Sequence, residues 1–158
     1  MNGGQLLMVL GSIALFSLIN LSANRITQNS LEERIEAEGI LTATAVAEQV
    51  LNEARSRSFD DATSTAIVDD VQNFSYSLGP ESGETLSNFN DVDDYNNHSR
   101  AIATPRVGVD SVNVAVDYVS PGSPDTPVGY QTRMKRVAVT VSNPMLSRPL
   151  TLYYYYSY

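Results

Sequence analysis

The sequence predicts an α+β fold: a very long N-terminal α-helix, apolar in its first half, packed on a C-terminal antiparallel β-sheet. Three observations indicate this fold. No charged residue precedes Arg25, all seven prolines lie at Pro80 or later, and apolar and polar residues alternate from Arg106 onward. Proline breaks helices, and an alternation of period two is typical of half-buried strands. We therefore expect a helix over residues 1–58 and a globular head over residues 59–158.

Composition excludes several classes of site. The chain has 158 residues, which suits one ordinary domain of roughly 100–150 residues. It contains no cysteine and a single histidine, His98, so a disulfide framework, a thiolate zinc site and an imidazole-rich metal site are excluded. The 18 acidic and 10 basic residues give a formal net charge of −8. Nucleic acid is not expected as a primary partner, because its binding depends on neutralising phosphates and the basic patch of Arg133, Lys135 and Arg136 is small.

The first segment of the expected helix is apolar enough for a membrane. Residues 6–23 just reach the lower bound of about 17 apolar residues for a spanning helix, if Asn20 and Ser22 are tolerated near one end. A cleaved secretory signal is the alternative, but this segment has no basic start and no clear cleavage site. We expect the following residues in the membrane or in contacts between copies of the chain: Gln5, Leu6, Leu7, Met8, Val9, Leu10, Ile13, Leu15, Phe16, Leu18 and Ile19.

The expected helix continues as an amphipathic segment from Ser22 to Phe59. Apolar residues such as Leu31 and Ile35 return every three to four positions, and charged residues fall mostly on the other side. An unbroken helix from Gln5 to Ser58 would be about 80 Å long at about 1.5 Å per residue. A helix of this length cannot bury its whole apolar side against the head. Its first half must therefore meet lipid, other copies of the chain, or both.

The head is expected to hold a long loop over residues 60–105 and an antiparallel meander over residues 106–158. Two strands are marked by valines at alternate positions, which place the valines on one face of a sheet. These valines are Val112, Val114, Val116, Val137, Val139 and Val141. A link rich in proline and glycine over residues 121–127 separates these two strands. A third strand follows at residues 150–158, with tyrosines on both of its faces.

A short uncharged apolar N-terminus that leads into a long amphipathic helix and a small antiparallel sheet resembles the type IV pilins and the related type II secretion pseudopilins. A second, local likeness is to minor pilins of the mannose-sensitive haemagglutinin type, in residues 78–85 (LGPESGET) and residues 89–95 (FNDVDDY). The resemblance implies a pilin-like fold and a subunit that polymerises through its hydrophobic N-terminal helix.

The N-terminus departs from the pilin pattern. Pilins of this family usually carry glutamate at the fifth position of the mature chain, where this sequence has Gln5 if Met1 is the mature start. Glutamine cannot form an ion pair with the terminal amine of a neighbouring subunit, although it can accept a hydrogen bond. The resemblance implies processing at one of two positions. One is immediately before Met1, and the other is Gly4, in which case the residues up to Gly4 form a very short leader. The absence of basic residues from such a leader favours the first alternative.

The C-terminus departs as well. Many pilins close their C-terminal region with a disulfide, which a chain without cysteine cannot form. We therefore expect the tyrosine-rich C-terminal strand to anchor that end of the chain by packing alone.

Asp91, Asp93 and Asp94 form the densest acidic cluster, with Glu81 and Glu84 nearby. Calcium prefers several carboxylate and carbonyl oxygens from a flexible loop, and some of the pseudopilins that this chain resembles bind calcium in their C-terminal loops. The three aspartates are therefore a candidate calcium site, and no other cofactor is expected. The alternative is a solvated turn in which the aspartates cap backbone amides.

We expect a structural protein and not an enzyme, because His98 and Ser99 lack the glycine-rich elbow of a serine nucleophile. The resemblance implies a homo-oligomeric helical filament outside the cell, an inner-membrane-anchored precursor, and contacts with a pilus or secretion assembly machinery. Two alternatives remain. One is a minor pilin or pseudopilin that acts as a tip or ligand-binding component, and the other is a membrane-anchored periplasmic domain that does not polymerise.

Overall fold

The long N-terminal helix is present. The structure, a computed structural model, describes residues 2–158 and divides into two compact units, the first ending at Glu38 and the second comprising Gly39–Tyr158. Helix α1, Gly3–Arg55, has 53 residues and crosses this division. This helix differs from the expected one only by a few residues at its ends. Together with the antiparallel sheet of the second unit, it confirms the expected α+β class.

Helix α1 ends where the chain begins to pair with a distant loop. The backbone N–H of Ser58 donates to the carbonyl of Asn90 at 3.2 Å, and the carbonyl of Ser58 accepts from the N–H of Val92 at 3.0 Å. A continued helix would direct these two groups along its own axis, so the pairing requires the helix to stop first. Arg55 occupies the last turn, where a cation suits the helix dipole.

The second unit is built on one antiparallel sheet of five strands. They are β1 (Ser99–Thr104), β2 (Gly108–Ser120), β3 (Ser123–Pro127), β4 (Met134–Ser142) and β5 (Leu150–Ser157). Four of them follow the order β1-β2-β4-β5, and β3 pairs with the end of β2. The segment between α1 and the sheet carries only short helices: α2 (Asp61–Thr65), η1 (Val71–Asn73) and η2 (Asp93–Tyr95).

Strands β1 and β3 lie where the sequence predicts a loop and a turn. Strand β1 reads Ser-Arg-Ala-Ile-Ala-Thr and has no strong alternation of its own, but all six of its residues pair with β2, from Ser99 opposite Asn113 to Thr104 opposite Gly108. Strand β3 contains two prolines, and its pairing with β2 is irregular near Val119 and Ser120. Both strands therefore depend on the long β2 as a template rather than on local propensity.

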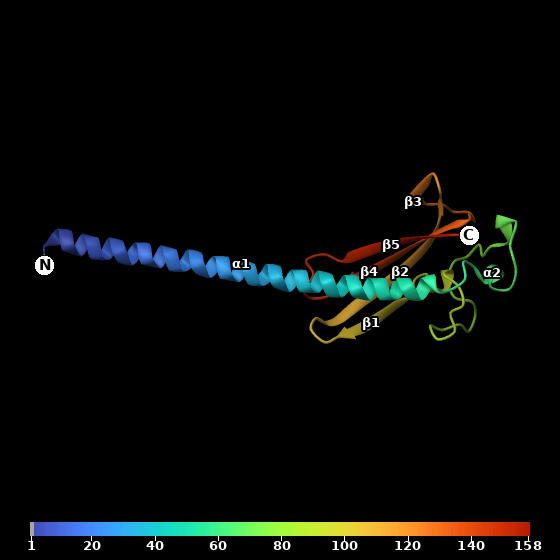
Figure 1. Cartoon of the computed structure of the whole chain (residues 1–158), viewed down its shortest axis with the longest axis horizontal. Coiled ribbons are helices and arrows are strands. Elements are labelled where there is room, and N and C mark those ends of the chain that lie inside the picture. Colours follow the sequence, from blue (N-terminus) through green and yellow to red (C-terminus); the bar gives the residue numbers. More distant parts are fainter. Residues whose placement is uncertain (1) are drawn as a thin grey trace. The chain divides into compact units, whose positions relative to one another are not determined.

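The main core lies between α1 and one face of the sheet, as Figure 1 shows for the cyan-to-green turns of α1. In the register of the sheet, Val112 faces Val141, Val114 faces Val139 and Val116 faces Val137, as the alternation predicts. All six valines are at most 3% exposed. The face of α1 against them is made mostly of small residues, with one leucine: Gly39, Ala43, Val46, Ala47, Val50, Leu51 and Ala54. Small residues allow the helix to approach the sheet closely.

The tyrosines of β5 divide between its two faces, as expected. Tyr154 and Tyr156 pack against the core, and the hydroxyl of Tyr156 donates to the carbonyl of Arg57 at 2.8 Å. Tyr153 is 56% exposed on the other face. At the end of the chain, the hydroxyl of Tyr158 accepts from the N–H of Val68 at 2.8 Å. Packing and hydrogen bonds thus hold the C-terminal strand in a chain that has no cysteine.

We expect Gly39→Ala to lower the melting temperature of the head in the detergent-solubilised full chain. A Cβ at residue 39 would lie 2.9 Å from Cβ of Met145 and 3.3 Å from its carbonyl carbon. Overpacking costs about 1–3 kcal/mol, which outweighs the gain of about 1 kcal/mol in helix propensity. The control is Gly129→Ala, because an added Cβ there meets nothing within 4 Å. A Gly39→Ala variant as stable as the control would contradict the close helix approach.

Candidate functional site

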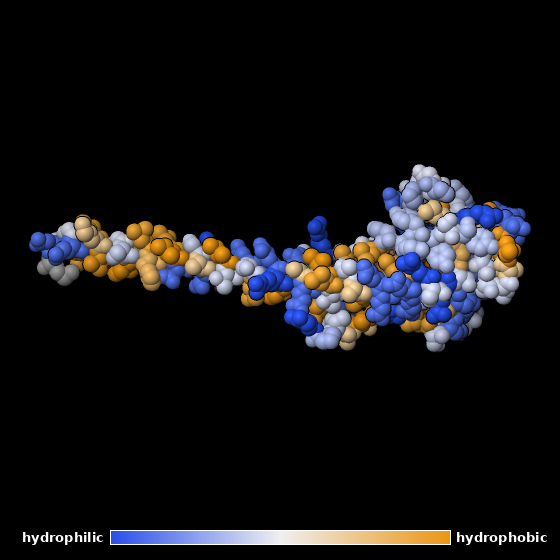
Figure 2. All heavy atoms as spheres, in the orientation of Figure 1, coloured by the Kyte–Doolittle hydropathy of each residue, from blue (hydrophilic) through white to orange (hydrophobic). Residues whose placement is uncertain are grey.

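The first unit presents an uncovered apolar surface. The ten large apolar residues expected in the membrane or in contacts between copies are each 50–79% exposed. Orange apolar atoms accordingly dominate this part of α1 in Figure 2. The helix is long and apolar enough to cross a membrane, and none of its apolar window is buried within the chain. A buried side chain of this size contributes about 1.5–3 kcal/mol relative to an exposed one, so this surface requires an apolar environment.

Three polar side chains within this segment donate to backbone carbonyls of the same helix. The hydroxyls of Ser12 and Ser17 donate to the carbonyls of Val9 and Ile13, both at 2.9 Å. The side-chain amide of Asn20 donates to the carbonyl of Phe16 at 3.0 Å. In a membrane or a dry interface, an unsatisfied donor would cost several kcal/mol. These internal hydrogen bonds therefore make the segment compatible with an apolar environment.

The two candidate processing positions remain untested. Gly4 lies in the first turn of α1, and Gln5 is exposed immediately after it. The backbone N–H of Gln5 donates to the carbonyl of Asn2 at 2.9 Å. The position immediately before Met1 lies outside the described residues.

The second unit contains a buried ionic cluster at the end of α1. Nζ of Lys135 on β4 donates to Oδ2 of Asp60 at 2.9 Å, to Oδ1 of Asp93 at 2.6 Å and to the carbonyl of Phe59 at 2.7 Å. The side chains of the lysine and both aspartates are at most 1% exposed. An ion pair this deeply buried repays its desolvation only when all three ammonium donors find partners, as they do in this cluster.

Aromatic rings and backbone groups complete the cluster. The ring centroids of Phe59 and Tyr118 lie 4.5 Å and 5.2 Å from Nζ of Lys135, so both rings face the cation. The hydroxyl of Tyr118 donates to the carbonyl of Ser75 at 2.9 Å. Asp60 also caps helix α2 by accepting from the N–H of Ala62 at 3.2 Å. The cluster thus joins the end of α1, the loop and the sheet.

The three predicted calcium ligands have different partners in the structure. Asp93 binds Lys135, whereas Oδ1 of Asp91 accepts from the N–H groups of Asp93 and Asp94 at 2.9 Å and 3.2 Å. Oδ2 of Asp94 accepts from the N–H groups of Asn90 and Asp91 at 2.8 Å and 3.1 Å. The backbone capping that the sequence suggested as the alternative to calcium is therefore present, but the turn is not solvated, because all three aspartates are at most 1% exposed. Whether calcium also binds stays a prediction.

One of the buried aspartates, Asp91, has a pKa well above the usual value of an aspartate. Burial, the charge of Asp93 and a hydrogen bond with its side chain raise the pKa of Asp91 to about 8. Oδ2 of Asp91 and Oδ2 of Asp93 have no hydrogen-bond partner among the described residues when both carboxyl groups are ionised. A proton on Asp91 at neutral pH supplies the missing donor between them.

A second acidic group lies beside this cluster. Glu81, Glu84 and Asp94 bring one carboxylate oxygen each to within 4.8 Å of one another. Burial and a hydrogen bond with the Glu84 side chain raise the pKa of Glu81 to about 7.

The basic patch expected from the sequence does not form one surface. Lys135 is fully buried, Arg136 pairs with Asp117 at 2.9 Å, and Arg133 donates to the carbonyl of Asp69. The sequence missed Lys135 as the partner of the acidic loop. A signal was available: Lys135 is in phase with the alternating Val137, Val139 and Val141, which places it on the same face of the strand.

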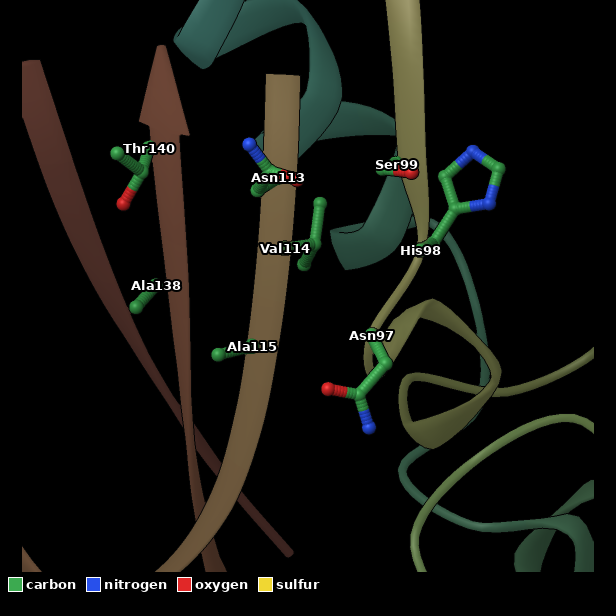
Figure 3. A pocket seen from close by; sticks show the side chains of 8 residues that line it. All are labelled: Asn97, His98, Ser99, Asn113, Val114, Ala115, Ala138 and Thr140. Carbon is green, nitrogen blue, oxygen red and sulfur yellow. The ribbon is translucent and has the colours of Figure 1, made fainter. Parts of the chain in front are cut away.

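His98 lies beside a small hollow on the sheet, and the residues that line it include few groups that could act as acids, bases or nucleophiles. The hollow is lined by Asn97, His98, Ser99, Asn113, Val114, Ala115, Ala138 and Thr140, of which only His98 titrates near neutral pH. Figure 3 shows the imidazole turned away from the strand residues of the hollow. The imidazole instead packs edge-on against the ring of Phe89, with the two ring centroids 5.6 Å apart. Burial and the charge of Arg100 lower the pKa of His98.

The fold and the exposed helix define a pilin-like architecture, in which a long, N-terminally apolar helix packs on an antiparallel sheet. Scans against protein-family models, curated proteins and solved structures found no match to this chain. The likeness to pilins therefore rests on architecture and on the residues quoted above.

Lys135→Met is expected to destabilise the head by about 3–5 kcal/mol, because two carboxylates remain buried without their cation. Urea denaturation followed by circular dichroism measures this loss. Arg133→Met is the control, since Arg133 is exposed and its removal should cost less than about 1 kcal/mol. Equal losses in the two variants would show that the buried cluster adds no special stability.

The stability of the head is expected to fall as the pH rises from about 4 to about 8. Folded Asp91 keeps its proton up to about pH 8, whereas an unfolded aspartate loses it near pH 3.9. Between these values the folded state binds more protons, so the unfolding free energy decreases as the pH rises. The charged neighbours of Asp91 are Asp93, Asp94 and Lys135.

Denaturation midpoints across this pH range, measured in EDTA, test the dependence. Asp91→Asn should flatten the slope, because asparagine keeps an acceptor for the two capped amides and carries a fixed donor. Asp70→Asn, at an exposed loop position, should leave the slope unchanged. An unchanged slope in Asp91→Asn would contradict the assignment of this proton to Asp91.

Proposed function

We propose that this chain is a structural, non-catalytic subunit of an extracellular type IV pilus-like filament, polymerising through the apolar first half of α1. One observation carries the proposal: an uncharged helical segment whose ten large apolar side chains are all at least half exposed. Monomeric soluble proteins rarely expose apolar surface on this scale. The segment therefore belongs in lipid or among copies of itself.

Both environments are consistent with the same surface. In the proposed precursor, residues 6–23 span the inner membrane, and in the filament they pack against the same segment of neighbouring subunits. Transfer between the two costs little, because lipid tails and apolar side chains are similar surroundings. Each long helix touches several neighbours, so individually weak contacts add up through multivalency. An assembly machinery in the membrane would supply the directed transfer.

Apolar residues beyond the membrane segment favour a filament over a simple anchor. Ile26, Leu31 and Ile35 follow the first charged residue, Arg25, and are 69%, 58% and 42% exposed. Leu31 and Ile35 are four residues apart and so share one face of the helix. A membrane anchor needs no apolar stripe outside the bilayer, whereas a helical bundle of subunits uses one. The head, with its polar exposed surface, would then coat the filament.

Removing detergent from the purified full chain should yield filaments visible by negative-stain electron microscopy. A chain that begins at Arg25 should remain dispersed, because it lacks the ten exposed apolar side chains. A Leu31→Ser/Ile35→Ser double variant should keep membrane association but form at least tenfold fewer filaments. The control is Ile67→Ser, which removes a large apolar side chain that is 86% exposed in the head.

The outcomes separate the alternatives. Filaments from the chain that begins at Arg25, or an equal loss in the Ile67→Ser control, would overturn polymerisation through α1. A full chain that enters vesicles but never polymerises would identify an anchored domain. A chain that joins filaments only at their ends would identify a tip component.

A further inference from the structure

Two strands leave the edges of the sheet open. Strands β1 and β5 end the order β1-β2-β4-β5, and they lie on opposite sides of β2 and β4 in Figure 1. Among residues 2–158, no backbone group of either strand is hydrogen-bonded to the backbone of a segment other than its neighbouring strand. Each edge therefore presents a row of unpaired N–H and C=O groups, which is a template for a further strand.

The two edges lack the features that normally prevent the addition of a strand. Natural edge strands are blunted by charged residues, by proline or by bulges. Strand β5 has no charged residue and no proline, and all eight of its residues pair with β4 without interruption. The only charged residue of β1, Arg100, is bound to Glu53 of α1 at 2.7 Å. Neither edge is thus protected against a strand from another molecule.

The directions of the two edge strands make them complementary. Each neighbouring pair in the order β1-β2-β4-β5 is antiparallel, so β1 and β5 run in opposite directions. In copies that share one orientation, as the subunits of the proposed filament do, the β5 edge of one copy faces the β1 edge of the next. The two strands then meet antiparallel, which continues the pattern of the sheet. A head-to-tail contact of this kind can be repeated along a helical assembly.

The side chains of the two edges are complementary in size. We call the face of the sheet turned away from α1 the outer face. There β1 carries Ala101 and Ala103, and short side chains of β1, β2 and β4 line two hollows, one of which is drawn in Figure 3. On the same face β5 carries Tyr153 and Tyr155, and Tyr153 is 56% exposed. The tyrosine rings of one copy can therefore lie over the alanines of the next.

We propose that β1 of one copy pairs antiparallel with β5 of the next, so that neighbouring heads form one continuous sheet. This inference rests on the proposed filament, which gives the copies a common orientation. It deepens that proposal, because it assigns a contact to the heads in addition to the contact through α1. The tyrosine-rich strand would then serve both the fold of its own head and the junction with the next.

The alternation of side chains restricts the register of this pairing. All six residues of β1 find partners in β5 when Ser99 lies opposite Tyr155, Tyr156 or Ser157. The second of these registers would place the outer residues of β1 beside the core residues of β5, so it is excluded. In the two registers that remain, Ala101 lies opposite Tyr153 or opposite Tyr155.

Disulfide cross-linking of filaments tests the pairing, because the native chain has no cysteine. Filaments of Ala101→Cys/Tyr153→Cys and of Ala101→Cys/Tyr155→Cys are oxidised with copper phenanthroline and separated on a denaturing gel without reductant. Opposed residues of antiparallel strands lie about 4.5–5.5 Å apart at Cα, which is within reach of a disulfide. Within one chain, β2 and β4 separate the two cysteines by about 14 Å, so an internal disulfide cannot form.

We expect one of the two double variants to give a ladder of dimers, trimers and longer cross-linked chains that disappears on reduction. The variants with a single cysteine should stay monomeric on the gel, because their one thiol has no partner at the junction. The matched control is Ala101→Cys/Ile67→Cys, whose second cysteine replaces a head residue that is 86% exposed. It should give at least tenfold less cross-linked product.

The outcomes distinguish this inference from the proposed function. Intact filaments in which neither double variant cross-links more than the control would overturn the strand pairing and leave the proposed function standing. Dimers from Tyr153→Cys or Tyr155→Cys alone, with no longer products from the double variants, would show that two β5 edges pair with each other, and would also overturn it. A native chain that forms no filaments would overturn the proposed function and this inference with it.

Discussion

The division of α1 between two environments is the constraint on which the rest of the structure depends. Its C-terminal part buries glycine, alanine, valine and a single leucine against a sheet face made of valines. Its N-terminal part exposes leucine, isoleucine, methionine and phenylalanine. In most soluble proteins the largest apolar residues are the ones inside. In α1 the large apolar residues are outside the core of the head, so the head packs without them. Their burial must come from lipid or from other molecules.

Close packing explains why small residues serve the head best. Three rows of paired valines line this face of the sheet, and a helix that presents Gly39, Ala43, Ala47 and Ala54 comes near enough to cover them. Gly39 extends this contact to the link before β5, where a larger side chain would meet Met145. Leucine in place of Ala43 or Ala47 would push the helix away and leave voids along the valine rows, which cores tolerate poorly.

Buried charged side chains hold the loop to the sheet in a chain that has no cysteine for a disulfide. Lys135 joins the end of α1, the loop and β4 through three hydrogen bonds, in an environment with two aromatic rings. Such a cluster gains stability only when it is complete, so it also selects one arrangement of the loop.

The sequence alone determined the long helix, its uncharged start and the valine faces of β2 and β4, because periodicity and proline placement are local signals. It could not reveal β1, whose weak pattern becomes a strand only beside β2. It grouped Asp91, Asp93 and Asp94 because they are adjacent, whereas the folded chain gives each a different partner. It also placed Lys135 in a surface patch. Tertiary structure decided these points, because partners such as Lys135 and Asp93 lie 42 residues apart and only folding brings their charges into one buried site.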